Sequence, residues 1–276
     1  MLAKKQSEIL QGTEKEFLDV FKQLCYSRSS WQVWADLMCV MACAISNAVD
    51  IIPAHREPRE KEYEQCIKRL GSVEVASQML AIVVMALEKN PEQDFLGEMY
   101  MRLNLGNHWK GQFFTPYCVC KAMSEITVGN ASDQIDSKGY VSVCDPACGA
   151  GATLIAAANT FADKRKDYQN HVLFVGQDID RVTGMMCYIQ LSLLGCAGYV
   201  CIGNSLTNPL TGHVLFPAEQ PGQELWFTPI FHSQVWTFRR LFNSSIFGSG
   251  TVTTQKTVEK EHFFMFFDFK EQEELA

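Results

Sequence analysis

The chain has 276 residues, of which 47% are hydrophobic and 11% are aromatic, enough for one sizeable core or for two subdomains. Its formal net charge of −7 excludes a strongly basic nucleic-acid-binding chain. Because duplex binding depends on Lys and Arg neutralising phosphates, any DNA contacts would need a local basic patch or a partner.

The eleven cysteines are scattered and odd in number, with no Cys-x-x-Cys pair and no Cys/His cluster at zinc spacing. This distribution predicts reduced, mostly buried thiols in a cytoplasmic protein, and no metal site. Cys39 and Cys43 are one helical turn apart, so we expect them to share a buried face.

Residues 1–109 form a predicted helical region. Phe17, Leu18, Phe21 and Leu24 recur at helical spacing, and Ser29 or Ser30 can cap the next helix. That helix covers the most apolar long stretch, residues 31–49, whose uninterrupted apolar core is too short to span a bilayer. We therefore expect a buried helix and no membrane span.

Two further helices are predicted over residues 60–70 and 72–89, after a loop bracketed by Pro53 and Pro58. The basic residues of this segment are interleaved with glutamates, which predicts a solvated helix face; they are Arg56, Arg59, Lys61, Lys68 and Arg69.

From residue 110 the pattern changes to α/β. Thr115 is a candidate N-cap with Pro116 at the first helical position, and the helix runs to about Val128, before a polar loop over residues 129–139. Strands then alternate with helices at residues 141–144, 152–161, 172–177, 181–194 and 199–202. This alternation predicts a parallel sheet with right-handed crossovers.

The most informative stretch is the predicted strand-to-helix turn that runs from Asp145 through Pro146, Ala147, Cys148, Gly149 and Ala150 to Gly151. Such a turn points backbone N–H groups outward at a helix N-terminus, where glycines let a ligand approach closely. Asp145 stands where a carboxylate could hold a cationic or hydroxyl-bearing part of the ligand. Alone, the two glycines are a weak signal, because a tight turn needs them too.

Two neighbouring segments strengthen the nucleotide interpretation. A second apolar strand ends at Asp178, the position of a carboxylate that binds ribose hydroxyls. The run Gln112, Phe113, Phe114, Thr115, Pro116 lies upstream. Leu154 stands at the third position of a dinucleotide fingerprint, and no Gly-Lys-Ser/Thr follows the glycines, so a dinucleotide site fits less well and a P-loop is excluded.

Together these segments, over roughly residues 110–210, resemble the methylation subunits of type I restriction-modification systems, DNA methyltransferases that use S-adenosylmethionine (SAM) and act on adenine N6. The resemblance implies a Rossmann-like SAM-dependent methyltransferase domain, preceded by a helical region. It implies that residues 112–116 close over SAM, that Asp145, Ala147, Gly149, Ala150 and Gly151 hold its methionine part, and that Asp178 binds its ribose. Asn204, in Gly203-Asn204-Ser205-Leu206, would accept a hydrogen bond from the SAM adenine in place of the family's usual acid.

The chain departs from this family at the catalytic motif. The family has a polar residue, two prolines and an aromatic at the end of its fourth strand, which orient the target amino group and stack on the flipped base. This sequence has no Pro-Pro dipeptide, and the nearest match is Asn208-Pro209-Leu210, directly after the 203–206 element. Asn208 is the candidate catalytic residue, with a Pro-terminated turn as the alternative.

After Leu206 the pattern is loop-rich and strongly aromatic over residues 226–247, which indicates a core-packing edge or a base-stacking surface. We expect a methyltransferase-like domain over residues 110–247 and a linker with a C-terminal strand or tail over 248–276. Residues 244–254 are rich in Gly, Ser and Thr and predict a linker or flexible turn, and a strand is predicted at residues 262–269. Three functions stay open: adenine methylation of DNA with a specificity subunit in a hetero-oligomer, a non-catalytic SAM-binding subunit for assembly or regulation, and methyl transfer to a non-DNA acceptor.

Overall fold

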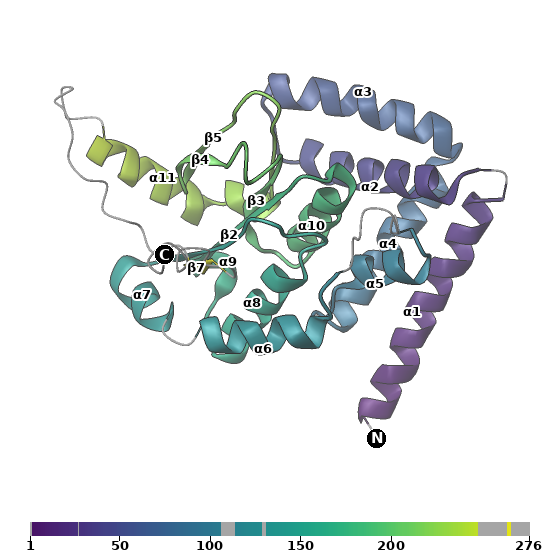
Figure 1. Cartoon of the computed structure of the whole chain (residues 1–276), viewed down its shortest axis with the longest axis horizontal. Coiled ribbons are helices and arrows are strands. Elements are labelled where there is room, and N and C mark those ends of the chain that lie inside the picture. Colours follow the sequence, from purple (N-terminus) through teal and green to yellow (C-terminus); the bar gives the residue numbers. More distant parts are fainter. Residues whose placement is uncertain (1, 27, 106–113, 129–130, 248–263, 266–276) are drawn as a thin grey trace, which may run out of the picture.

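The computed structural model describes residues 2–26, 28–105, 114–128, 131–247 and 264–265. It is an α/β structure with a mainly parallel sheet and a helical N-terminal region, as predicted (Figure 1). Five strands lie in the order β6-β3-β2-β1-β7: β1 (Val141–Asp145), β2 (Val172–Asp178), β3 (Ala197–Ile202), β6 (Glu224–Phe227) and β7 (Phe264–Met265). Among these five described strands, β6 alone runs antiparallel to its neighbour.

The predicted alternation of strands and helices is confirmed between residues 141 and 202. β1 is followed by α8 (Ala152–Asp163), and the short α9 (Tyr168–His171) leads into β2. β2 is followed by α10 (Arg181–Leu193), which leads into β3. β1 and β2 pair from Val141↔Val172 to Asp145↔Gly176, so their carboxyl ends meet at the same edge.

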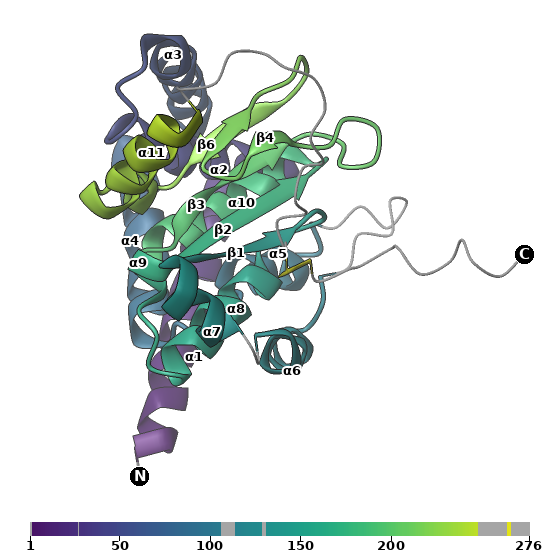
Figure 2. The same ribbon diagram turned by 90° about the vertical axis from the view of Figure 1, so that its left-hand side faces the viewer.

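Helices and short elements cover both faces of the sheet (Figure 2). Val172 and Phe174 of β2 pack in a core shared with α8 and α10. The alternate residues Leu173 and Val175 pack on the other face, with Phe231 and Trp236. These aromatic residues lie in η1 (Pro229–His232) and α11 (Gln234–Phe247) and belong to the core, which agrees with one of the two predicted alternatives for this part of the region. Phe238 and Phe242 of α11 are exposed.

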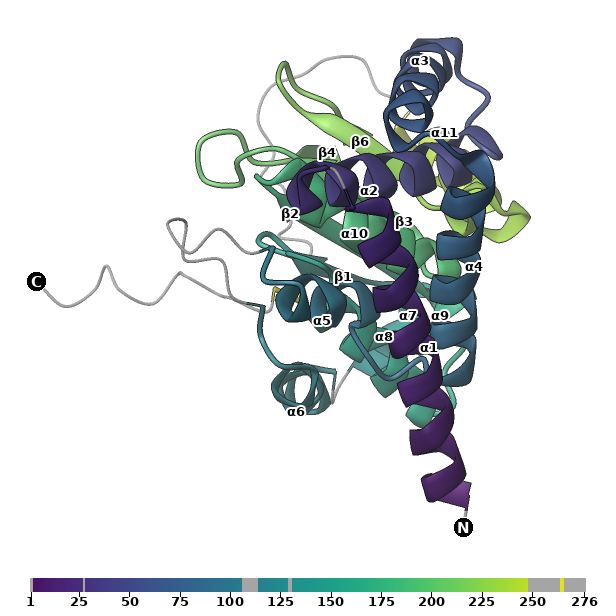
Figure 3. The ribbon, with the colours of Figure 1, turned by 90° about the vertical axis from the view of Figure 1, so that its right-hand side faces the viewer.

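The N-terminal helices form a layer outside α10, and α2 crosses this helix (Figure 3). They are α1 (Leu2–Leu24), α2 (Ser30–Asn47), α3 (Pro53–Leu70), α4 (Val73–Lys89) and α5 (Phe95–Arg102). Buried residues of α1, α2 and α4 belong to the same hydrophobic core as α8 and α10. No described helix by itself is long and apolar enough to cross a bilayer, although α3 and α4 together, bent by 103°, pass that test of length and composition.

Four expectations about local structure were wrong. Pro53 and Pro58 bracket no loop, because α3 begins at Pro53 and continues through Pro58. A proline fits the first helical position, and the later one removes only one helical hydrogen bond. Pro116 has extended backbone and is the N-cap of α6 (Tyr117–Thr127), so the helix begins one residue later than predicted. Residues 131–138 of the predicted loop form the helix α7 (Ala131–Lys138), which buries Ala131 and Ile135.

The fourth error concerns Arg59, which is buried rather than part of a solvated helix face. Its guanidinium donates to Asp50 (3.0 Å) and to the Leu225 carbonyl oxygen of β6 (2.6 Å), and it lies 4.1 Å from the centre of the Trp226 ring. This arginine therefore joins α3 to the edge of the sheet.

The region after β3 has more structure than the sequence indicates. A hairpin of β4 (Thr211–His213) and β5 (Phe216–Ala218) precedes β6, and α11 extends to Phe247, into the segment predicted as a linker. Of the predicted strand at residues 262–269, the two described residues form β7, which pairs in parallel with β1 through Val143↔Phe264 and Cys144↔Met265.

Candidate functional site

The turn after β1 is held by the carboxylate of Asp145, which is only 1% exposed. One oxygen accepts a hydrogen bond from the Ala147 N–H (3.0 Å) and the other accepts one from the hydroxyl of Thr153, in the first turn of α8. The side chain thus fixes the path of the chain into the helix. The sequence indicated a carboxylate open to a ligand, whereas both oxygens of Asp145 have partners inside the protein.

The two glycines of the turn have left-handed backbone, with φ of +53° at Gly149 and +98° at Gly151. A Cβ atom on Gly149 would lie 3.2 Å from ring carbons of Phe114, and one on Gly151 would lie 2.9 Å from the Sγ of Cys187. Both positions therefore favour glycine for conformation and for space. Gly151 is also the N-cap of α8, so the turn ends at a helix N-terminus. Within the turn, the N–H groups of Cys148 and Gly151 donate to the carbonyl oxygens of Gln177 (3.0 Å) and Cys148 (2.8 Å).

Asp178 joins the two predicted segments at the carboxyl ends of β1 and β2. Its Oδ2 accepts a hydrogen bond from the Gly149 N–H (2.8 Å). Its Oδ1 accepts from the Asp180 N–H (2.8 Å) and from the Thr183 hydroxyl (3.2 Å). A carboxylate offers about four lone-pair positions, so these three donors leave about one for a further hydroxyl group. The turn and the acid are therefore parts of one site.

Burial changes the acidity of both carboxyl groups. Loss of solvent raises the pKa of Asp145 and of Asp178 above the usual range, and the nearby charge of Asp178 adds to the effect at Asp145. The hydrogen bonds from Ala147, Thr153 and Gly149 act in the opposite direction by stabilising the ionised forms.

The raised pKa of Asp145 gives a pH dependence. A carboxyl group with a higher pKa in the folded chain stabilises the fold below its unfolded pKa, and this contribution is lost as pH rises through the folded pKa. We therefore expect the difference in unfolding free energy between wild type and Asp145→Asn to narrow between about pH 4 and neutral pH, since only wild type titrates there. Urea unfolding of both proteins across this range measures the difference. A constant or widening difference would show that ionised Asp145 carries no burial penalty.

The loop after β3 lies against the same edge of the sheet. The Gly203 N–H donates to the Asp178 carbonyl oxygen (2.8 Å). The side-chain oxygen of Asn204 accepts from the N–H groups of Leu206 (2.9 Å) and Thr207 (3.1 Å), so it shapes its own turn. Its amide N–H₂ group supplies two donors that these bonds do not use.

Asn208 follows in this loop, and its amide donates to the Pro221 carbonyl oxygen at 3.2 Å. It precedes β4, whereas the strand that pairs with β1 on the side away from β2 is β7, which comes much later in the chain. Asn208 therefore does not lie at the end of β7, the strand that pairs with β1 on the side away from β2.

Sequence reasoning missed two buried glutamines that position the site. Gln177, 4% exposed, donates to the carbonyl oxygens of Gly203 (3.3 Å) and Asn208 (3.0 Å), and its own oxygen accepts from the Leu210 N–H (3.1 Å). It ties the loop after β3 to the end of β2. The sequence places Gln177 directly before the acid, but it has no sign of this contact.

Gln190 of α10 connects the turn to the helical region. Its amide donates to the Ala150 carbonyl oxygen (2.9 Å) and to Asp94 (2.7 Å), the N-cap residue of α5, and its oxygen accepts from the Leu96 N–H (3.1 Å). Because these partners are far apart in the chain, no motif reveals the contact.

Of the predicted upstream segment, Gln112 and Phe113 lie outside the described residues. Phe114 lies beside Gly149 and packs on the ring of Tyr100 with centroids 5.3 Å apart. With Thr115 and Pro116 it also lines a cavity of about 500 Å³, whose other walls include the acidic residues Glu92 and Glu98. This cavity lies next to the segment and is not lined by the 145–151 turn.

A family model described as N-6 DNA Methylase matches residues 92–271, about two thirds of the chain. The chain belongs to the N-6 DNA methylase family. The match includes the turn, Asp178, Asn204, Asn208 and β7, and it begins before α5, ahead of the predicted boundary at residue 110.

Among solved structures, the chain is similar to the type I restriction-modification system methyltransferase subunit from Streptococcus thermophilus, with 13% sequence identity and a TM-score of 0.39. The alignment covers 74% of this chain and 60% of that subunit, so the chain spans less than two thirds of its length. No curated protein matches the chain.

Proposed function

We propose that this N-6 DNA methylase family member binds SAM at the carboxyl edge of β1 and β2 and transfers its methyl group to adenine N6 in DNA. The observation that carries the proposal is the 2.8 Å hydrogen bond between the Gly149 N–H and Asp178, which unites the glycine turn and the acid in one site. The site combines a turn with two positions that favour glycine, a helix N-terminus and an acid at the end of the next strand. This combination suits a nucleoside-type ligand.

The residues of this site fit SAM by chemistry. The turn over residues 147–151 would hold the methionine part through the backbone groups that its internal hydrogen bonds do not use, with Asp145 keeping the turn in place. The remaining acceptor position of Asp178 would take a ribose hydroxyl, and Asn204 would face the adenine. Ile179 and Leu206, which follow Asp178 and Asn204 closely, are 69% and 89% exposed and would offer apolar contact to the adenine ring. Phe114, Thr115 and Pro116, continuing from Gln112 and Phe113, would close over the cofactor.

Bound SAM would supply a methyl group on a sulfonium for direct displacement. The protein's part in such a reaction is alignment of the acceptor nitrogen, with little demand for a strong base. In this proposal Asn208 accepts a hydrogen bond from the target amino group. Its backbone oxygen is held by Gln177 and by Gln223 (2.8 Å), which gives the residue a fixed place next to the end of β2.

DNA would be recognised together with a specificity subunit in a hetero-oligomer. The net charge of −7 supports this division of labour, because phosphate contacts need Lys and Arg that a partner can provide.

A second candidate function is a SAM-binding subunit that does not transfer methyl groups and serves assembly or regulation. The observation that favours it is the 3.2 Å hydrogen bond from the Asn208 amide to Pro221, because it uses the residue as part of a turn. The missing Pro-Pro-aromatic motif agrees with this alternative. Methyl transfer to a non-DNA acceptor is the third.

The substitution Asn208→Ala separates these functions. We expect it to leave SAM affinity unchanged and to reduce methyl transfer to unmethylated DNA by more than ~100-fold, since it would misalign the acceptor nitrogen. Incorporation of radiolabelled methyl groups into DNA, with any required partner present, is the measurement, and Asn170→Ala on α9 is the matched control. Unchanged transfer would remove Asn208 as the acceptor residue, and SAM binding without DNA methylation by wild type would favour the other two functions.

A further inference from the structure

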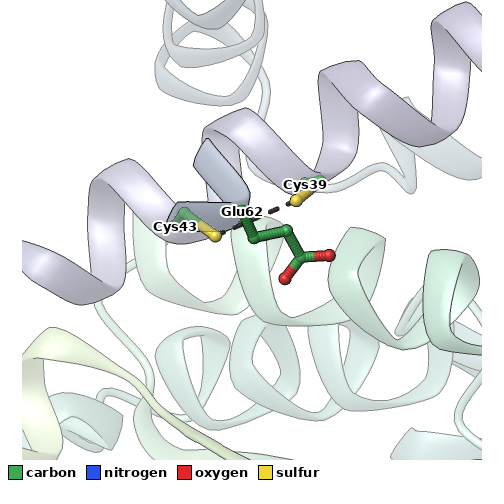
Figure 4. A group of neighbouring side chains, drawn as sticks. All are labelled: Cys39, Cys43 and Glu62. Atoms are coloured by element: carbon green, nitrogen blue, oxygen red, sulfur yellow. Dashed lines mark hydrogen bonds between the residues drawn. The ribbon is translucent and has the colours of Figure 1, made fainter. Parts of the chain in front are cut away.

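Three buried or half-buried sulfur and carboxylate ligands meet where α2 and α3 pack together. Cys39 and Cys43 lie one turn apart on α2, and the side chain of Glu62 of α3 lies beside them (Figure 4). The Sγ atoms of Cys39 and Cys43 and a carboxylate oxygen of Glu62 all lie within 4.8 Å of one another. Cys66, one turn after Glu62 on α3, is buried and lies within hydrogen-bonding reach of Cys39. It lies outside the group of three mutually close ligand atoms, so its side chain would turn toward Cys43 and Glu62 to become a fourth ligand.

We propose that these four residues bind a structural zinc ion: Cys39 and Cys43 from α2, and Glu62 and Cys66 from α3. The site is separate from the proposed SAM site and does not depend on it. The sequence prediction of no metal site was based on the absence of Cys-x-x-Cys pairs. In the structure each helix carries two ligands at positions i and i+4, which lie on one face of the helix: Cys39 and Cys43 on α2, Glu62 and Cys66 on α3.

The sulfur geometry suits a tetrahedral metal. With zinc–sulfur bonds of about 2.3 Å, two thiolates of a tetrahedral site lie about 3.8 Å apart. The Sγ atoms of Cys39 and Cys43 lie 3.9 Å apart, the distance of a hydrogen bond between the two thiols in the absence of a metal ion. A disulfide would need about 2.05 Å, so the pair is placed for a shared metal ion and not for a bond between the sulfurs.

Two arginines donate hydrogen bonds to ligands of the proposed site. Arg69 donates from Nη2 to the Sγ of Cys66 at 3.0 Å. Arg181 pairs with both oxygens of Glu62 at 2.7 Å, which leaves lone pairs on that carboxylate for a metal. Zinc with three thiolates and one carboxylate would carry a net charge of −2. The two arginines reduce this charge in part, because Arg69 also pairs with Asp36 (2.6 Å) and Arg181 also pairs with Glu224 (2.9 Å).

Zinc here would clamp two helices that the rest of the fold depends on. α2 packs on α10, and α3 reaches the sheet edge through Arg59 and Leu225. A metal ion shared by α2 and α3 would fix the layer that supports the sheet, which is the role of a closed site with four protein ligands.

The test measures the metal content and the Co²⁺ absorption spectrum of the purified chain. We expect about one equivalent of zinc by elemental analysis and, after exchange, the intense visible absorption of tetrahedral cobalt with a thiolate charge-transfer band. Cys39→Ser and Cys66→Ser should each lower zinc affinity by more than ~100-fold, beyond the loss caused by second-shell changes. The control is Cys196→Ser, because Cys196 is a buried thiol directly before β3 and lies outside the cluster. This variant should still bind about one equivalent of zinc.

Because a cysteine variant can fail to fold, the cobalt spectrum of the wild-type chain decides independently of any substitution. An octahedral cobalt spectrum without thiolate bands, or a chain that binds neither metal at micromolar concentration, would overturn the proposal. So would an unchanged zinc equivalent in the double variant of Cys39 and Cys66, or mass-spectrometric detection of a Cys39–Cys66 disulfide in the chain as purified.

Discussion

Replacing Asp178 by alanine is expected to reduce SAM affinity by at least ~100-fold, or about 2.8 kcal/mol, since each tenfold is about 1.4 kcal/mol. Two losses combine in this variant. The ribose loses a charged acceptor, and a hydrogen bond to a charged group contributes about 1.5–3 kcal/mol. The Gly149 N–H also loses its partner at 2.8 Å, so the glycine turn is no longer held against β2. Isothermal titration calorimetry of both proteins with SAM is the measurement.

Asp167→Ala provides the matched control for this prediction. Asp167 caps α9 before β2 begins, at the opposite end of the strand from Asp178. It accepts a hydrogen bond from the Asn170 N–H at 3.3 Å, so its removal also breaks a local cap. Equal SAM affinity in wild type and Asp178→Ala would place the cofactor elsewhere, and a well-folded wild type that binds no SAM would refute the cofactor proposal for the isolated chain.

Replacing Arg59 by methionine is expected to lower the free energy of unfolding by about 3 kcal/mol or more. Removing one partner of a buried ion pair costs about 3–5 kcal/mol, because the other charge stays buried without compensation. Arg59 pairs with Asp50, whose side chain is 2% exposed, and also donates to the Ser46 hydroxyl at 2.7 Å and to Leu225. His55 contacts the Asp50 carboxylate at 2.9 Å, so this carboxylate keeps one partner in the variant. We therefore expect a loss of stability toward the lower end of the range.

The exposed residue Arg56 on the same helix makes Arg56→Met the control, with an expected change within about 0.5 kcal/mol. Urea unfolding followed by circular dichroism measures both variants. If both substitutions destabilise the chain equally, the effect comes from the helix and not from the buried contacts of Arg59.

The sequence was most informative where local patterns and chain order decide the structure. The strands around Val143 and Phe174 and the helices between them follow from apolar periodicity, and the turn follows from its glycines. Sequence patterns gave wrong predictions where contacts between residues far apart in the chain determine the local structure. Residues 131–138 are polar enough to suggest a loop, yet Ile135 finds a place in the core and the segment forms a helix.

The candidate site divides in the same way. Asp145 and Asp178 could be named from their positions at strand ends, because parallel strands bring such ends together. The roles of Gln177 and Gln190 could not, since a buried amide is recognised only by the backbone groups it meets. The sulfur cluster on α2 and α3 was hidden for another reason, because its two halves are separated in the chain and join only when the helices pack.

The pairing of β7 with β1 has a consequence for synthesis of the chain. Val143 of β1 pairs with Phe264 of β7. The edge of β1 that faces β7 can therefore pair only after residues 121 positions later in the chain have been synthesised. During translation that edge presents free backbone N–H and C=O groups, the kind of surface on which other chains can add a strand. Nascent chains stalled before residue 264 should therefore depend on chaperones or a partner more than the finished protein does, and they should be the species that aggregates first when the protein is overproduced.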